Sequence, residues 1–240
     1  MKVAFIGGGV MGEAMVSALI KKGVAEPEEV VVSDIDQTRL EALREKHHIH
    51  AGDNNRSAIQ GCDVVVLAVK PQSLAEVMAE LKGKLWKKQL ALSIVAGASI
   101  KAISQGLSHD LIVRAMPNTP AQIGAGISVW TAAEAVSESG KEMARAILAA
   151  LGKEVYVPDE RYIDMATAVS GSGPAYIFLV MEGLIAAAVE IGLPQELAEE
   201  LVLETALGSA RLVQESEKSA AELRRMVTSP GGTTAEGVLR

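Results

Sequence analysis

Three glycines near the N-terminus constrain the fold of this chain more than any other feature. Residues 7–12, Gly-Gly-Gly-Val-Met-Gly, have the spacing G-x-G-x-x-G, and they directly follow the β-prone run Val3–Ile6. A helix-like segment begins at Glu13. In a strand–turn–helix unit, Gly7 permits the tight turn, Gly9 lets the backbone approach a pyrophosphate, and Gly12 allows close helix packing. The motif predicts a dinucleotide-binding βαβ unit; the alternative is a glycine-rich turn without a ligand.

The first 158 residues alternate between short β-prone runs and helix-like segments. The expected strands are Val3–Ile6, Val30–Ser33, Val64–Val69, Leu90–Val95, Leu111–Ala115, Gly126–Thr131 and Glu154–Val157. The expected helices are Glu13–Lys22, Gln37–Lys46, Leu74–Leu81, with a Ser73/Glu76 capping box, and Glu138–Leu151. Continuous apolar strands between helices predict a mostly parallel sheet covered on both faces, which is an α/β doubly wound sheet of the Rossmann type.

The character of the sequence changes after Pro158. Only helical patterns follow, at Tyr162–Val169, Ala175–Ile191, Gln195–Gln214 and Ala220–Val227, the last with a Ser219/Glu222 capping box. We therefore expect two domains, residues 1–158 for dinucleotide binding and an all-helical domain at residues 159–240. The helical half has more apolar surface than one small domain buries, which predicts a homodimer through residues 161–240.

Composition and charge exclude several classes of protein. The net charge of −7 argues against a nucleic-acid binder, and the single cysteine, Cys62, excludes an internal disulfide and fits a reducing compartment. The longest apolar stretch of the second half, Ala175–Val189, is interrupted by Glu182 and is shorter than the roughly 18 residues of a membrane span. We expect a cytoplasmic protein without a signal peptide or a membrane partner.

The histidines give no sign of a metal site. Three of them cluster at positions 47, 48 and 50, but no cysteine or acidic ligand accompanies them at zinc spacing. His109 is expected in a surface loop.

The end of the second expected strand supplies candidates for the adenosine half of a dinucleotide. Asp34 lies 22 residues after Gly12, near the spacing of about 20 for a carboxylate that accepts from the ribose 2′-hydroxyl. This carboxylate favours NADH, whereas Ser33 and Arg39 could hold the 2′-phosphate of NADPH. Asn55 is a further candidate. For Arg39 a solvated helix-face charge remains the alternative, and for Asn55 an ordinary turn residue.

Three further stretches are unusual for purely structural sequence. In Arg-Ala-Met-Pro-Asn-Thr-Pro, residues 114–120, two prolines fix the backbone of Asn118 and Thr119 at the ligand edge of the sheet. Val-Ser-Gly-Ser-Gly-Pro-Ala-Tyr, residues 169–176, precedes an apolar helix. Thr-Ser-Pro-Gly-Gly-Thr-Thr, residues 228–234, combines backbone N–H groups with hydroxyls. A turn of this last kind at a helix start suits one carboxylate; an interhelical loop is the alternative.

Taken in order, these motifs resemble the pyrroline-5-carboxylate reductase family over essentially the whole chain, with Ala-Val-Lys-Pro at residues 68–71 as a further match. The resemblance implies NAD(P)H-dependent reduction of 1-pyrroline-5-carboxylate to L-proline, the last step of proline biosynthesis, and it points to NADPH as the coenzyme. Because of Asp34 we expect NADH to be used as well. It implies a helical C-terminal domain that forms a dimer and completes the active sites, and often a decamer built from dimers.

The resemblance also implies roles for particular residues. Ser229, Gly231, Gly232 and Thr233 would bind the substrate carboxylate, Thr234 would hydrogen-bond the ring nitrogen and relay its proton, and Glu217 would lie near that nitrogen. The coenzyme would be bound by Gly7, Gly9, Met11, Gly12, Ser33, Asp34, Arg39, Asn55, Ala68, Val69, Lys70, Asn118 and Thr119.

This chain departs from the family pattern at two places. Many members have Asn-Arg where it has Ser33-Asp34, and the family usually continues by a helix or two beyond position 240, so we expect a truncated chain.

Two other functions share parts of this pattern. A 3-hydroxyacid-type dehydrogenase also combines a Rossmann domain with helices, but it needs a catalytic lysine in the helical part, and none occurs between Arg161 and Gln214. A non-catalytic redox sensor would bind a dinucleotide without needing the loop at residues 228–234. Formation of proline with NADPH or NADH separates the three.

Overall fold

The chain forms two compact units, Met1–Pro174 and Ala175–Arg240. The computed structural model describes residues 1–232, 234, 235 and 237. Helix α7 (Arg161–Ala166) and the π-helix η3 (Thr167–Gly171) belong to the first unit. The expected domain boundary after residue 158 stays a prediction.

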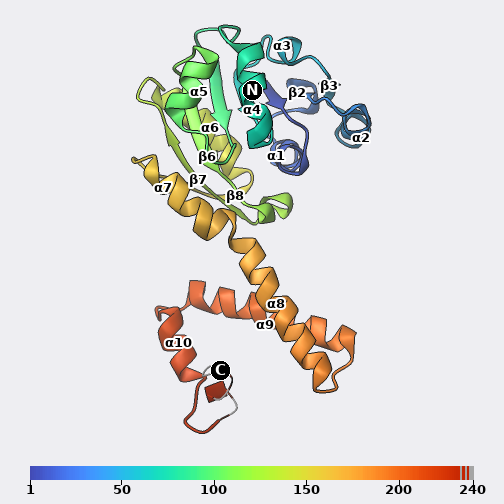
Figure 1. Ribbon diagram of the computed structural model, residues 1–240, viewed down its shortest axis with the longest axis vertical. Helices are drawn as coiled ribbons and strands as arrows, with labels where there is room; N and C mark the ends of the chain where they lie inside the picture. The colour runs from blue at the N-terminus through green and yellow to red at the C-terminus, as the bar shows by residue number, and fades with distance from the viewer. Residues whose placement is uncertain (233, 236, 238–240) are drawn as a thin grey trace. The chain divides into compact units, whose positions relative to one another are not determined.

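The first unit is built on one eight-stranded sheet with the strand order β3-β2-β1-β4-β5-β6-β7-β8 (Figure 1). All neighbouring strands are parallel except β6 and β7. The strand order reverses between β1 and β4, and ligands of open α/β sheets bind at such a point. The predicted doubly wound sheet is confirmed. The strands are β1 (Val3–Ile6), β2 (Val30–Ser33), β3 (His50–Gly52), β4 (Val64–Leu67), β5 (Leu90–Ser93), β6 (Ile112–Met116), β7 (Gly126–Ala132) and β8 (Gly152–Tyr156).

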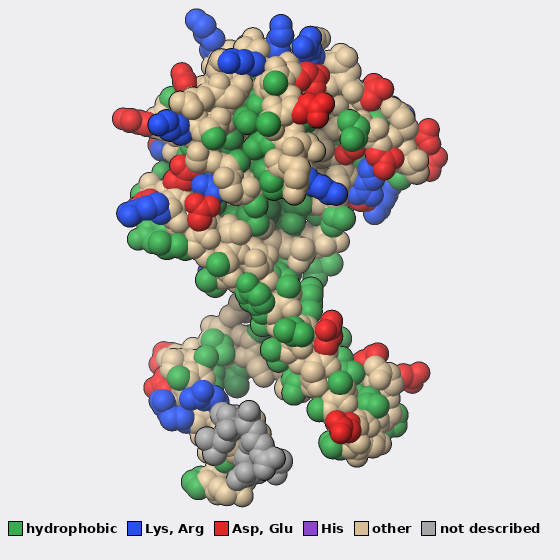
Figure 2. Space-filling view, viewed as in Figure 1, with side chains coloured by type: hydrophobic (Ala, Val, Ile, Leu, Met, Phe, Trp, Pro, Cys, Tyr) green, Lys and Arg blue, Asp and Glu red, His purple; other side chains and the backbone are tan. Residues whose placement is uncertain are grey.

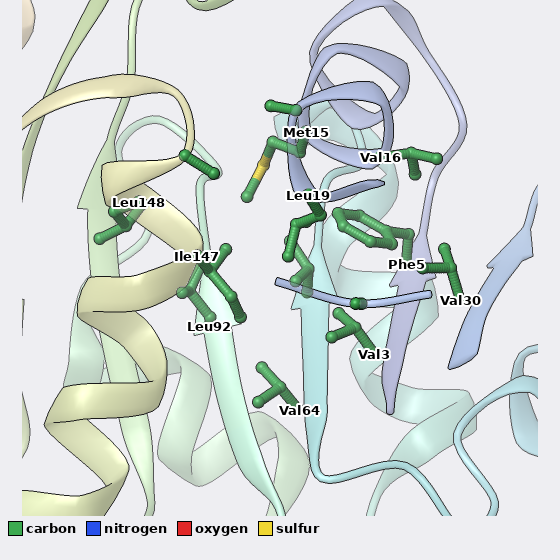
Figure 3. Close-up of a cluster of buried hydrophobic side chains, with 14 of the residues drawn as sticks. Val3, Phe5, Met15, Val16, Leu19, Val30, Val64, Leu92, Ile147 and Leu148 are labelled. Carbon is green, nitrogen blue, oxygen red and sulfur yellow. The ribbon is translucent and has the colours of Figure 1, made fainter. Parts of the chain in front are cut away.

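Helices cover both faces of this sheet because its strands are apolar on both sides. Along β1, Val3 and Phe5 belong to one buried cluster, and Ala4 and Ile6 belong to another. The first cluster includes side chains of α1, α2 and α6, and Figure 3 shows some of them around Phe5. The second includes side chains of α3, α4 and α5. The helical elements are α1 (Val10–Lys21), η1 (Pro27–Glu29), α2 (Gln37–His47), α3 (Asn55–Ala58), α4 (Pro71–Leu81), α5 (Ile100–Leu107), η2 (Thr119–Ile123) and α6 (Glu138–Ala149).

Two local expectations are wrong. The Ser73/Glu76 capping box does not form, because α4 begins at Pro71 with Lys70 as its N-cap, which places Ser73 inside the first turn. His109 is buried rather than exposed, and its Nε2 donates to the carbonyl of Gln89 at 2.6 Å. Strand β3, which has three residues, and helices α3 and α5 were not predicted.

The second unit consists of helices with almost no core of their own. It contains most of α8 (Gly173–Glu190), then α9 (Gln195–Glu215) and α10 (Ala220–Met226), whose Ser219/Glu222 capping box is confirmed. In the described part of this unit, only Ala198 and Val202 are buried. Large apolar side chains on α8 and α9 are exposed, and green side chains are visible along these helices in Figure 2. They include Tyr176, Ile177, Phe178, Leu179, Leu184, Leu201, Leu203, Leu207 and Leu212.

One helix in the described residues passes a length-and-composition test for a membrane span. It runs for 30 residues, Arg161–Glu190, with a mean hydropathy of 1.6 over its most apolar window. The helix is longer than the apolar stretch Ala175–Val189 that it contains, and the expected absence of a membrane partner stays a prediction. The glycine-serine stretch near Gly171 does not end the helix but continues it as the π-turn of η3. An apolar helix of this kind also suits a protein–protein interface.

A buried arginine ties three elements of the first unit together. Arg114 on β6 is only 3% exposed, and its Nη1 donates to Glu160 Oε1 at 2.9 Å while its Nη2 donates to Asp164 on α7. Glu160 Oε1 also accepts from the backbone N–H of Ile100, the first residue of α5, at 2.7 Å. One guanidinium thus links β6 to α7 directly and to α5 through Glu160.

Arg114→Met should lower the free energy of unfolding by about 1–3 kcal/mol, because it leaves two carboxylates without their partner. This loss is smaller than the one expected for a fully buried ion pair, because both carboxylates are partly solvated. Arg161→Met is the matched control, since Arg161 pairs with Asp159 on the surface, and its effect on stability should be clearly smaller. Urea unfolding of both variants measures the difference. Equal losses would contradict a special role for the buried pair.

Candidate functional site

The glycine loop packs backbone directly against backbone at the point where the strand order reverses. Gly7 has a φ of +105°, and a Cβ there would lie 2.6 Å from the carbonyl oxygen of Ala68. A Cβ on Gly12 would lie 2.4 Å from the carbonyl oxygen of Gly7. Both positions therefore require glycine. The contact joins the end of β1, the start of α1 and the residue after β4.

The same loop leaves space on its other side. A Cβ added at Gly9 would meet nothing within 4 Å. Gly9 is the N-cap of α1 and has no side chain to accept from the first N–H groups of the helix. These groups, with the positive end of the helix dipole, can bind a phosphate. This open helix start at Gly9, called the phosphate cradle below, fits the pyrophosphate of a dinucleotide.

The residues after β4 and β6 lie at the same edge of the first unit. Ala68 donates its N–H to the carbonyl of Ile6 at 2.8 Å, which fixes the Ala68–Lys70 segment beside the glycine loop. The turn η2, which begins at Thr119, packs against α1. Asn118 Oδ1 accepts from the N–H of Ile127 at 2.9 Å, so this side chain holds the turn to β7. Thr119 is exposed at the start of η2.

At the end of β2, both backbone polar groups of Gly8 are hydrogen-bonded to side chains. Its N–H donates to Asp34 Oδ2 at 2.6 Å, and its carbonyl accepts from Arg39 Nε at 2.6 Å. The structure therefore brings Asp34 and Arg39 together at the glycine loop. Their roles toward a coenzyme remain predictions.

Glu13, in the first turn of α1, gathers three basic side chains from α2. Its carboxylate accepts from Lys46 Nζ at 2.8 Å and pairs with Arg39 Nη2, and His47 Nε2 lies 3.4 Å away. The hydrogen bond from Lys46 is the main cause that lowers the pKa of Glu13 to about 2, against an opposing effect of burial. The carboxylate is therefore ionised at neutral pH.

Sequence reasoning did not single out Glu13. The available signal was an acidic residue directly after the third glycine, in the α1 turn nearest the phosphate cradle.

Three other predicted coenzyme residues lie in different surroundings. The Ser33 side chain is 1% exposed, and among the described residues its hydroxyl has no hydrogen-bond partner. Asn55 Nδ2 donates to Glu80 Oε2 on α4 at 2.7 Å. Met11 packs against the first buried cluster. None of these contacts tests the predicted roles.

The predicted substrate loop belongs to the second unit. Gly231 has a φ of +72°, and Gly232 donates its N–H to the carbonyl of Ser229 at 3.0 Å, which closes a tight turn. Thr234 is exposed, as is Glu217. Thr233 lies outside the described residues. Within the part of the chain that the structure describes, no group of three His, Cys, Asp or Glu side chains could hold a metal ion.

The sheet topology, the glycine loop and the open start of α1 define a dinucleotide-binding protein of the Rossmann type. Two family models match the chain. The model described as pyrroline-5-carboxylate reductase dimerisation covers residues 160–240, and the one described as NADP oxidoreductase, coenzyme F420-dependent, covers residues 2–97.

Individual relatives match over nearly the full length. A pyrroline-5-carboxylate reductase from Synechocystis is 42% identical over 99% of this chain and 88% of its own. One from Pseudomonas aeruginosa is 40% identical over 99% of this chain and 87% of its own. This chain belongs to the pyrroline-5-carboxylate reductase family.

Solved structures of reductases from this family have the same fold as this chain. The reductase from Coxiella burnetii has a TM-score of 0.87 at 42% identity, covering 99% of this chain and 88% of its own. The Plasmodium falciparum enzyme with NADP bound has a TM-score of 0.91 at 31% identity, covering 100% of this chain and 88% of its own.

Two glycine variants should separate coenzyme binding from folding. Gly9→Ala should leave the melting temperature almost unchanged, because its methyl group enters open space, yet it should weaken NADPH binding at least about tenfold by filling the phosphate cradle. Gly12→Ala should lower stability by about 1–3 kcal/mol, because its methyl group meets the backbone of Gly7. Thermal unfolding and calorimetric titration measure the two effects. If Gly9→Ala bound NADPH normally, the phosphate site would lie elsewhere.

Proposed function

We propose that this protein reduces 1-pyrroline-5-carboxylate to L-proline with NADPH, the last step of proline biosynthesis, and that it also uses NADH. The observation that carries the proposal is the match to reductases of this family over 99% of the chain. The phosphate cradle at the glycine loop supports it, because this reaction needs a bound nicotinamide coenzyme.

The reaction adds one hydride and one proton across the cyclic C=N bond. The coenzyme supplies the hydride when it is bound. A protonated imine is already electrophilic, so the protein's main task is to hold the two reactants together in the correct orientation. We propose that Ser229, Gly231, Gly232 and Thr233 bind the substrate carboxylate through N–H and hydroxyl groups. Thr234 then hydrogen-bonds the ring nitrogen and relays its proton, with Glu217 near that nitrogen.

The coenzyme is held by the first unit in this proposal. Gly7, Gly9, Met11 and Gly12 accommodate the pyrophosphate at the start of α1. Asp34, Arg39 and Asn55 contact the adenosine half, while the buried Ser33 holds the glycine loop through its carbonyl, which accepts from the N–H of Gly7 at 2.8 Å. Ala68, Val69, Lys70, Asn118 and Thr119 flank the nicotinamide half, which agrees with the position of Ala68 beside Gly7.

The direct test is to incubate the purified protein with 1-pyrroline-5-carboxylate and either coenzyme and to measure proline by mass spectrometry. We expect proline with both coenzymes, in amounts equal to the NADPH or NADH oxidised. Binding of coenzyme without any proline would reject the enzyme proposal and favour the redox-sensor alternative.

Thr234→Ala should lower kcat/KM for the imine by about 10- to 100-fold, the loss expected for one hydrogen bond to the reacting nitrogen. Coenzyme affinity should change little. Thr228→Ala is the matched control in the same loop, because the Thr228 hydroxyl already donates a hydrogen bond to the carbonyl of Arg224 at 2.7 Å. If both variants lost activity equally, the loop's shape rather than the Thr234 hydroxyl would be responsible.

We also propose that the protein is a cytoplasmic homodimer formed through residues 161–240, and that dimers can assemble into decamers. The exposed apolar side chains of α8 and α9 support self-association over a membrane location, because Glu182 and Glu190 lie on the same helix as the apolar residues.

Light scattering of the purified protein without detergent should give at least twice the 25.1 kDa of one chain at micromolar concentration. The physical reason is that exposed apolar helices gain free energy when a second copy covers them. A 25.1 kDa particle in aqueous buffer would contradict the dimer, and recovery only in detergent would instead indicate a membrane partner.

A further inference from the structure

The adenosine end of the proposed coenzyme site contains a carboxylate that the reaction does not require. Glu13 is 19% exposed in its side chain and forms ion pairs with Arg39 and Lys46. It stands one residue after Gly12, so it is close to the phosphate cradle in the sequence as well as in space.

Arg39 is held in a defined place by these contacts. Its Nε donates to the carbonyl of Gly8 at 2.6 Å, and its Nη2 donates to Glu13. The N–H of the same Gly8 donates to Asp34 Oδ2 at 2.6 Å. The guanidinium and the Asp34 carboxylate therefore both contact the backbone of Gly8. In Rossmann folds the ribose 2′-substituent sits at this position, beside the end of the second strand.

We propose that Glu13 determines coenzyme specificity by acting through Arg39, and that it lowers the preference for NADPH; the inference rests on the proposed function for its coenzyme. In the observed arrangement Nη2 of Arg39 already donates to Glu13, whose carboxylate also pairs with Lys46. A 2′-phosphate must compete with this carboxylate for the guanidinium and is also repelled by it. A ribose 2′-hydroxyl makes neither demand, so NADH binding does not depend on Glu13.

The opposite role of Glu13 predicts the opposite change in NADPH affinity. If Glu13 presented Arg39 to the phosphate instead of competing for it, removing the charge of Glu13 would weaken NADPH binding. The direction of the change therefore decides between the two roles.

The experiment compares two adenosine fragments in the wild type and in Glu13→Gln. Calorimetry measures the affinity for adenosine 2′,5′-bisphosphate, which carries the 2′-phosphate, and for adenosine 5′-monophosphate, which does not. We expect Glu13→Gln to bind the bisphosphate about 5- to 10-fold more tightly and to change the affinity for the monophosphate less than about twofold. The ratio of kcat/KM for NADPH to that for NADH should rise in parallel.

Two further variants make the result specific. Glu138→Gln removes one negative charge from an ion pair with Lys141 on α6, and it should leave the affinity ratio unchanged. Adding Arg39→Gln to Glu13→Gln should abolish the gain. Because both fragments are measured on the same preparation, a fraction of unfolded protein does not alter the ratio.

An unchanged or lower ratio of bisphosphate affinity to monophosphate affinity in Glu13→Gln would overturn the inference. A gain in bisphosphate affinity that remains after Arg39 is also replaced would overturn it as well. The fragment measurements need no turnover. A failure of the proposed reaction therefore appears as absence of proline, while the affinity ratio still tests Glu13 independently.

Discussion

The structure of the first unit depends on one contact between bare backbones. At the end of β1 the chain turns so tightly that Gly12 lies on the carbonyl of Gly7, and Gly7 lies on the carbonyl of Ala68. This contact sets where α1 begins, how closely it approaches the sheet, and which N–H groups face outward. The parallel strands on either side, β2 and β4, pair with β1 along its full length and carry Asp34 and Ala68 to the same edge.

Much of this arrangement follows from the sequence. Continuous apolar runs predicted every strand except β3, and the glycine spacing predicted the turn after β1. The helix after this turn was expected from Glu13, whereas α1 begins at Val10. The sequence was less informative where tertiary contacts override local preference. Strand β3 has three residues and is stabilised by pairing with β2. The Ser73/Glu76 pattern was a good capping signal, but Pro71 starts the helix earlier, because its fixed φ suits a first turn.

The candidate site was predicted unevenly for a similar reason. Gly7 and Gly12 could be identified from the sequence because their backbone positions exclude every other residue. Asp34 could be assigned to the end of β2 from its spacing to Gly12, whereas spacing left Arg39 open between a coenzyme ligand and a solvated helix-face charge. The contact between Arg39 and Glu13 could not be predicted, because it depends on how α1 and α2 cross the sheet. Ser33 illustrates the limit, since its position at the end of β2 is as predicted but its side chain is buried.

The two units differ in where their hydrophobic free energy comes from. The first buries two clusters within one chain, whereas the described part of the second buries only Ala198 and Val202. In the proposed dimer, the folding free energy of this helical unit includes that of association, so its order follows mass action. Dilution of the proposed dimer is then expected to melt the helices before the sheet. The abundance of the protein, as well as its sequence, would in that case set the fraction of chains whose helical half is ordered.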